Sequence, residues 1–177
     1  MGLPVRAPEN RHRRRVVHDR LHHQSRPPTF GGRKKGGDQG IGRSRGGKST
    51  KVHLVVDALG LPVAFTLTPG QKHDAPPAVD LLSNVGELHC VLADKAYDSN
   101  EIRALLQDQG CDPCIPGRIN RIRPVPYDAH LYKARAEVEC TFNLLKQFRR
   151  FATRYEKTMR NYAAIVSLAC VCCWLRI

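Results

Sequence analysis

Apolar and polar positions divide the 177-residue chain into two textures. Before Lys51 there is almost no apolar periodicity, and we expect residues 1–50 to be loosely ordered. From Lys51 onward, β-branched and apolar runs predict a hairpin, because Gly60–Pro62 separates one run over Lys51–Ala58 from a second over Val63–Thr68.

Beyond the hairpin, helical spacing alternates with short apolar runs. The pattern predicts, in order, a helix over Ala75–Leu82, a strand over His89–Ala93, a helix from the N-cap Ser99 to Gly110, a strand over Cys111–Ile115, a helix over Leu131–Phe148 and a helix over Asn161–Leu175. The last helix is apolar on most faces, so we expect it to pack deep in the core, with Trp174 as a core residue. This order favours an α/β fold in which helices pack on one mixed sheet.

Charge points to a polyanionic partner. The chain has 29 Lys and Arg residues against 16 Asp and Glu residues, a formal net charge of +13. Such an excess attracts phosphate groups over long range, so nucleic acid is the first partner to test. The alternative is a basic surface that only keeps the protein soluble.

The seven cysteines and the apolar runs bear on the compartment. Cys111 and Cys114 form one C-x-x-C without a second pair, so we interpret the cysteines as reduced core residues, with a structural zinc protein as the alternative. No segment has the layout of a signal peptide, and the apolar run Ala163–Leu175 is shorter than the roughly 20 residues that cross a bilayer. We therefore expect a cytoplasmic protein without a membrane partner.

Two carboxylates stand at positions that suit metal binding. Asp94 follows a predicted buried strand, and functional sites of open α/β sheets lie at such carboxyl ends. Glu139 lies in mid-helix beside Val138, where a carboxylate is costly unless a cation neutralises it. Divalent cations prefer oxygen ligands, and two of them about 3.5–4 Å apart serve phosphodiester cleavage and strand transfer.

A longer pattern surrounds Glu139. Tyr132, Arg135, Glu139 and Lys146 are spaced as Y-x2-R-x3-E-x6-K, which resembles the signature of a large superfamily of bacterial insertion-sequence DDE transposases. The text ECTFNLLKQFRRFATRYEK, and the earlier segments KKGGDQGIGRSRGGKSTKVH, LTPGQKHDA and ADKAYDS, are similar to family motifs in the same order. The resemblance covers about Arg33–Arg176. Without its flanks, the pattern would equally fit a salt-bridged helix face.

The resemblance implies a ribonuclease-H-like fold and DNA transposition, by metal-dependent cleavage and strand transfer at insertion-sequence ends. It implies that three acids hold two Mg²⁺ or Mn²⁺ ions, with Asp94 as the second acid and Glu139 as the third, both catalytic. Its partner would be double-stranded DNA at transposon ends and target, bound in an arrangement compatible with a homodimer. Tyr132, Arg135 and Lys146 would contact that DNA, and the alternative for Arg135 and Lys146 is to pair with the Glu139 carboxylate.

Two basic segments are further candidates for DNA contact. Arg118, Arg121 and Arg123 would grip DNA near the site, and the alternative is a solvated loop. Gly42–Ser49 has the spacing of a phosphate-cradling loop, but no strand precedes it and no helix follows. We therefore interpret Gly42–Ser49 as a flexible contact to the DNA backbone.

The first acid is where the sequence departs from the family. The family has an Asp-Ser-Thr motif on its opening strand, and HDRLHHQSRPPTFGG stands here instead. Asp19 lies near the expected spacing, fifteen residues before Lys34, but Arg, His and Pro predict a degraded first strand. Codons displaced by one base would permit the missing motif. We therefore expect residues 1–32 to be a disordered, out-of-frame leader and residues 33–177 to be the catalytic domain.

This departure has a consequence for activity. Unless Asp19 replaces the missing acid as a metal ligand, we expect metal-dependent cleavage to be impaired by orders of magnitude. The alternative function is that of a catalytically inactive transposase remnant that binds DNA.

Overall fold

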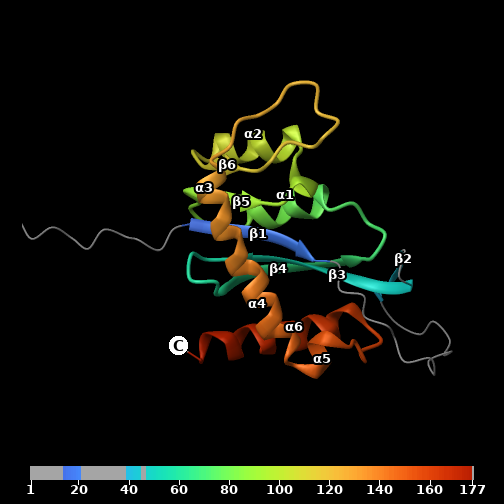
Figure 1. Cartoon of the computed structure of the whole chain (residues 1–177). Coiled ribbons are helices and arrows are strands. Elements are labelled where there is room, and N and C mark those ends of the chain that lie inside the picture. The colour runs from blue at the N-terminus through green and yellow to red at the C-terminus, as the bar shows by residue number, and fades with distance from the viewer. Residues whose placement is uncertain (1–13, 21–38, 45–46, 177) are drawn as a thin grey trace, which may run out of the picture.

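The computed structural model describes residues 14–20, 39–44 and 47–176, and for 14–20 it describes the backbone. In this part of the chain, helices cover both faces of one sheet (Figure 1). The strands are β1 (Arg14–Arg20), β2 (Gly42–Ser44), β3 (Gly47–Val56), β4 (Pro62–Pro69), β5 (Cys90–Ala93) and β6 (Asp112–Cys114). The helices are α1 (Ala75–Ser83), α2 (Asn100–Asp108), α3 (Ala129–Tyr132), α4 (Ala136–Lys146), α5 (Arg149–Ala152) and α6 (Met159–Trp174), with 3₁₀ turns η1 (Lys95–Tyr97) and η2 (Lys133–Arg135).

β1 lies at the centre of the sheet. It pairs antiparallel with β3, where Val16 faces Val56, and parallel with β5, where Val17 faces Ala93. β3 continues into antiparallel pairs with β4 and β2, and β6 extends the sheet parallel to β5. The carboxyl ends of β1 and β5 therefore share one edge with the beginning of β3. This mixed sheet flanked by helices is the ribonuclease-H-like α/β arrangement expected from the sequence.

β1 corrects the expectation of a degraded first strand. Residues 16–20 pair with β3 and residues 14–17 pair with β5, although the sequence of the strand, RRVVHDR, is poor in apolar residues. A ladder is made by backbone N–H and C=O groups, which every residue except proline supplies, and no proline lies in this segment. The expectation of loose order is also wrong for residues 42–44 and 47–50, which belong to β2 and β3. The rest of the proposed leader, residues 1–13 and 21–32, lies outside the described residues.

Two apolar clusters fill the two faces of the sheet. Because side chains alternate along a strand, β3 contributes Leu54 to one cluster and Val55 to the other. The first cluster packs β3 and β5 against α4 and α6, through buried residues such as Leu92, Val138, Phe142, Leu145 and Val166. The second packs the opposite face against α1 and α2, through Leu82, Val91, Ile102, Leu106 and Ile115.

α6 does not pack deep in the core as predicted. One side of it is buried through Tyr162 and Val166, but Leu168 and Val171 on the other side are 63% and 53% exposed. α6 is an outer layer on one face of the sheet, so only its inner side meets other elements (Figure 1). Trp174, also expected in the core, is 47% exposed and donates from Nε1 to the carbonyl oxygen of Pro62 at 2.8 Å. None of the helices in the described residues is long and apolar enough to cross a membrane.

Helix boundaries follow local capping. Ser99 caps α2 as predicted, because its Oγ accepts a hydrogen bond from the Ile102 N–H at 3.1 Å. The single helix predicted over Leu131–Phe148 is instead divided into α3, η2 and α4. Asp128 starts this segment by accepting from the N–H groups of His130 and Leu131.

The cysteines are all free thiols. Cys111 and Cys114 are buried, and burial raises the pKa of Cys111 to about 12. This agrees with reduced core residues, except at Cys140, which is exposed on α4, and at Cys172, which is half-buried on α6. Cys140 lies outside the core because the buried side of α4 is formed by Val138, Thr141, Phe142 and Leu145.

Candidate functional site

Asp94 lies where the sequence predicts it, at the carboxyl end of a buried strand. Its backbone is extended (φ −68°, ψ 157°) between β5 and η1. The half-buried side chain lines a cavity of about 900 Å³, which the loop before α1 and the loop after β6 complete. Among the described residues, no hydrogen bond or ion pair engages its carboxylate. Asp94 is thus an acceptor open to a cation.

Asp74 lines the same cavity, but its charge is already balanced. The ammonium of Lys51, a buried β3 residue, pairs with the Asp74 carboxylate and donates to the carbonyl oxygen of Lys72 at 2.7 Å. Asp74 thus adds no unbalanced negative charge to the cavity.

Asp98 is a site residue that the sequence analysis did not single out. It is 4% exposed and accepts from Arg103 Nε at 2.8 Å, from Arg121 Nη1 at 2.7 Å and from the Arg118 N–H at 2.8 Å. Burial alone would raise the pKa of Asp98, but these hydrogen bonds outweigh burial and hold the pKa below its ordinary value. Its place in the ADKAYDS motif was the available signal. Asp98 therefore fixes the loop after β6 against the Asp94 cavity.

Two of the three arginines predicted to grip DNA hold this loop together. Arg118 donates from its guanidinium to the carbonyl oxygens of Lys95 and Ala96, at 3.2 and 2.5 Å. Arg121 reaches Asp98 and also Asn100 Oδ1, at 2.6 Å. The side chains of Arg118 and Arg121 thus attach the loop to the residues that follow β5. Arg123, the third predicted DNA contact, is exposed.

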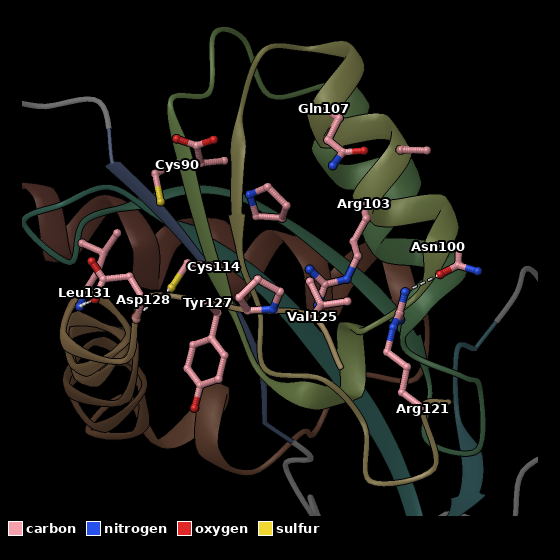
Figure 2. A pocket seen from close by; sticks show the side chains of 14 residues that line it. Cys90, Asn100, Arg103, Gln107, Cys114, Arg121, Val125, Tyr127, Asp128 and Leu131 are labelled. Atoms are coloured by element: carbon pink, nitrogen blue, oxygen red, sulfur yellow. Dashed lines mark hydrogen bonds between the residues drawn. The ribbon is translucent and has the colours of Figure 1, made fainter. Parts of the chain in front are cut away.

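A second cavity, of about 840 Å³, adjoins the first, and Arg121 borders both. Figure 2 shows it between α2 and β6, with the Arg121 guanidinium directed at Asn100 and with Cys114 and Asp128 on the opposite side. Arg103 points inward from α2, and its buried Nη1 has no hydrogen-bond partner among the described residues. This cavity contains neither Asp94 nor Glu139.

Glu139 lies on α4 and is held by Arg135, the last residue of η2. Arg135 Nη2 donates to Glu139 Oε1 at 2.9 Å, one turn apart, and the Glu139 side chain is 38% exposed. The Arg135 guanidinium also lies 5.5 Å from the centre of the Tyr132 ring. Lys146 is half-buried in the last turn of α4. Three of the four signature residues thus form a connected chain of contacts.

Asp94 and Glu139, the two predicted catalytic carboxylates, are connected through the packing of the elements that carry them. η2, which leads into α4, packs against β5. Burial raises the pKa of Tyr132, and the negative charge of Asp94 contributes to that rise, so Tyr132 lies near Asp94. Glu139 does not line the Asp94 cavity. Within the described ranges, no three Asp, Glu, His or Cys side chains gather closely enough to hold a metal ion.

The backbone of Asp19 lies at the same sheet edge as Asp94. In the register, Asp19 faces His53, and Val17, two residues earlier, faces Ala93. Asp19 is therefore near the carboxyl end of β1, beside the chain that leads from Ala93 into Asp94.

His53 is a second residue that sequence reasoning missed. It is fully buried between the Tyr97 hydroxyl at 3.2 Å and Thr68 Oγ1 at 2.9 Å. Burial, helped by the ammonium of Lys51, lowers its pKa to about 4. A histidine alternating with apolar residues in a predicted strand was the only available signal.

We expect His53 to make the fold sensitive to acid. Folded His53 stays neutral above about pH 4, whereas in the unfolded chain it binds a proton near pH 6.5. Stability is therefore fully present above pH 6.5 and falls by up to about 3 kcal/mol as the pH drops toward 4. Urea unfolding at pH 7.5 and pH 5 should show this loss in the wild type and a smaller one in His53→Gln. An equal loss in both proteins would contradict the prediction.

The sequence of this chain is similar to a known protein family and to two transposases. Residues 4–174 match the family described as the transposase DDE domain. The chain is 43% identical over 130 residues to a putative transposase for insertion sequence element IS6501 from Brucella ovis, covering 72% of this chain and 99% of that protein. It is 33% identical over 155 residues to a putative transposase for insertion sequence element IS402 from Burkholderia cepacia, covering 81% and 70%.

Two solved structures are similar at 15% identity. One is a simian T-cell lymphotropic virus intasome in complex with the PP2A regulatory subunit B56 gamma, with a TM-score of 0.49 over 88% of this chain and 46% of that chain. The other is the Mos1 strand transfer complex, with a TM-score of 0.40 over 91% and 54%. This chain thus spans about half the length of each solved chain.

Proposed function

This chain belongs to the DDE transposases of bacterial insertion sequences, a family that carries out DNA transposition, and from that membership we propose that Asp94 and Glu139 are its catalytic carboxylates. They would act in the cleavage and joining of double-stranded DNA at insertion-sequence ends. The observation that carries this proposal is the Asp94 carboxylate, which lines a large cavity at the sheet edge without a protein donor among the described residues.

The family depends on divalent metal ions, and the chemistry of the two proposed donors suits such ions. Asp94 and Glu139 offer carboxylate oxygens, the ligands that Mg²⁺ and Mn²⁺ prefer. When bound, two such ions activate the attacking oxygen and stabilise the leaving one. Glu139 would exchange its ion pair with Arg135 for a metal ion, which its half-exposed position permits.

We assign the remaining carboxylate to Asp19. Its backbone position in β1, next to the chain that carries Asp94, supports this assignment, and the family match from residue 4 onward spans β1. The catalytic domain would then begin with β1 rather than at residue 33. The reading frame of residues 1–32 stays a prediction, which the nucleotide sequence of the gene will test.

DNA would lie across the cavity edge. The α3–α4 side would contact it through Tyr132, Arg135 and Lys146, and the loop after β6 would contact it through Arg118, Arg121 and Arg123. Arg123 is exposed, and Arg118 and Arg121 would use the donors that remain beyond their contacts with Lys95, Ala96, Asp98 and Asn100. Pairing of the two insertion-sequence ends would favour a homodimer on DNA. The reaction would take place in the bacterial cytoplasm.

Cleavage of a duplex that carries the insertion-sequence end tests this function. The wild-type chain should nick the duplex with Mg²⁺ or Mn²⁺ and should leave it intact with a chelator. Binding of the duplex without nicking under any metal would instead support the inactive remnant. The mass of the protein–DNA complex in sedimentation would report whether two chains bind.

A further inference from the structure

The glycine-rich segment 42–49, whose sequence predicts a flexible contact, contributes two short strands that form an ordered ribbon. We call Gly42–Ser44 together with Gly47–Ser49 the basic ribbon. Its register pairs Gly42 with Ser49, Arg43 with Lys48 and Ser44 with Gly47. Ser49 Oγ donates to Ser44 Oγ at 2.9 Å and Ser44 Oγ donates to the Gly47 carbonyl oxygen at 3.1 Å, so side chains also tie the strands together.

The base of the basic ribbon is clamped to the body of the protein by Arg154. This arginine is 5% exposed and donates from Nη2 to the Gln39 carbonyl oxygen at 2.5 Å and from Nη1 to that of Gly40 at 3.4 Å. Arg154 Nη1 also donates to Thr50 Oγ1, which in turn donates to the Gly40 carbonyl oxygen at 2.7 Å. One guanidinium thus joins the segment that enters β2 to the beginning of β3, which fixes where the ribbon points.

Close packing adds to this clamp. A Cβ at Gly42 would lie 1.3 Å from Gln71 Oε1, and a Cβ at Gly70 would lie 2.0 Å from Ser49 Oγ. The Gln71 amide is the end of a flexible side chain that can move, whereas the Ser49 carbonyl oxygen, 3.1 Å from a Cβ at Gly70, is backbone, so Gly70 is the position where a side chain fits least.

Two positive charges stand side by side on the basic ribbon. Arg43 and Lys48 are directly opposite in the register and both are exposed. Like charges at opposite positions destabilise a strand pair, so this pairing has a cost in the free chain. A polyanion near both side chains would remove that cost, and DNA phosphates are such a partner.

The basic ribbon lies at the sheet edge where β1 and β5 end and where Asp94 is located. Val52 of β3 faces Arg20, the last residue of β1, so Lys48 lies four residues beyond that end, or about 13 Å along the strand. Figure 1 shows β2 and the beginning of β3 projecting past the other strands. We propose that the basic ribbon binds the backbone of duplex DNA through Arg43 and Lys48, and so holds the duplex across the Asp94 cavity. This inference rests on the proposed function.

The test is the salt dependence of binding to an end-containing duplex, measured by fluorescence anisotropy for the wild type, Arg43→Gln, Lys48→Gln and the double variant. The matched control is Arg176→Gln, which removes the same charge at the opposite end of β3, where neighbouring Trp174 contacts Pro62. Each ribbon variant should make the negative slope of log K against log salt shallower by about 0.9, and the double variant by about 1.8. At about 0.1 M salt, the affinity of the double variant for the duplex should be lower than that of the wild type by a factor of about ten or more.

Thermal unfolding checks that the exposed substitutions leave the fold intact. The proposal is overturned if the ribbon variants change the slope no more than Arg176→Gln does, as expected if Arg43 and Lys48 only protect an edge strand from aggregation. It is also overturned if the wild type does not bind duplex DNA. Ribbon-dependent binding without nicking supports the ribbon and contradicts only the catalytic proposal.

Discussion

An Asp94→Asn chain should bind duplex DNA at least as tightly as the wild type but nick it about a thousandfold more slowly or worse. Asparagine has the same shape as aspartate but no charge, so it is a poor ligand for a divalent cation. No hydrogen bond of the Asp94 carboxylate is lost within the described part of the chain, so the fold should persist. Nicking rates at saturating Mg²⁺, with DNA affinity and thermal unfolding measured alongside, check this expectation.

The matched control for this substitution is Asp80→Asn, which removes an equal charge from an exposed position on α1. It should nick at the wild-type rate. Equal rates for Asp94→Asn and the wild type would remove Asp94 from the site, whereas a loss of DNA binding or of the thermal transition in Asp94→Asn would show a structural role instead.

Replacing Asp98 should have the largest effect on stability. We expect Asp98→Ala to lower the free energy of unfolding by about 3–5 kcal/mol, because the substitution leaves the guanidinium of Arg103 buried without its counter-ion. Asp98 and Arg103 are 4% and 7% exposed, so water would replace the lost carboxylate only in part. Urea unfolding at pH 7 measures the difference.

Two further variants sharpen this test. Asp108→Ala removes an exposed carboxylate from the end of α2 and should change stability little. Adding Arg103→Met to Asp98→Ala should recover part of the loss, because no unpaired charge then remains in the interior. A loss in Asp98→Ala no larger than that in Asp108→Ala would contradict the prediction.

The sequence predicts elements well where local chemistry decides them. The β3–β4 hairpin follows from β-branched runs around Gly60, which adopts φ +79°, and the start of α2 follows from the hydroxyl of Ser99. β1 could not be predicted in this way, because partners distant in the sequence supply its hydrogen bonds on both sides. For α6, apolar composition overstated burial, since exposure depends on which layer a helix occupies.

The candidate site was predicted only in part. The position of Asp94 follows from the end of an apolar run, and that of Glu139 from the signature spacing. The partners that organise the site come from elsewhere in the chain: Lys51 reaches Asp74, and Asp98 gathers Arg121 from a distant loop. Such pairs join residues more than twenty positions apart, and no local pattern encodes them.

The central place of β1 has a consequence for biosynthesis. Its two neighbours, β3 and β5, are both made later, so the nascent chain cannot complete the middle of its sheet until residue 93 has left the ribosome. Contacts of such long sequence separation slow folding. A truncated messenger RNA that ends before the codons of β5 would yield a protein with unpaired strand edges, which favour aggregation between chains.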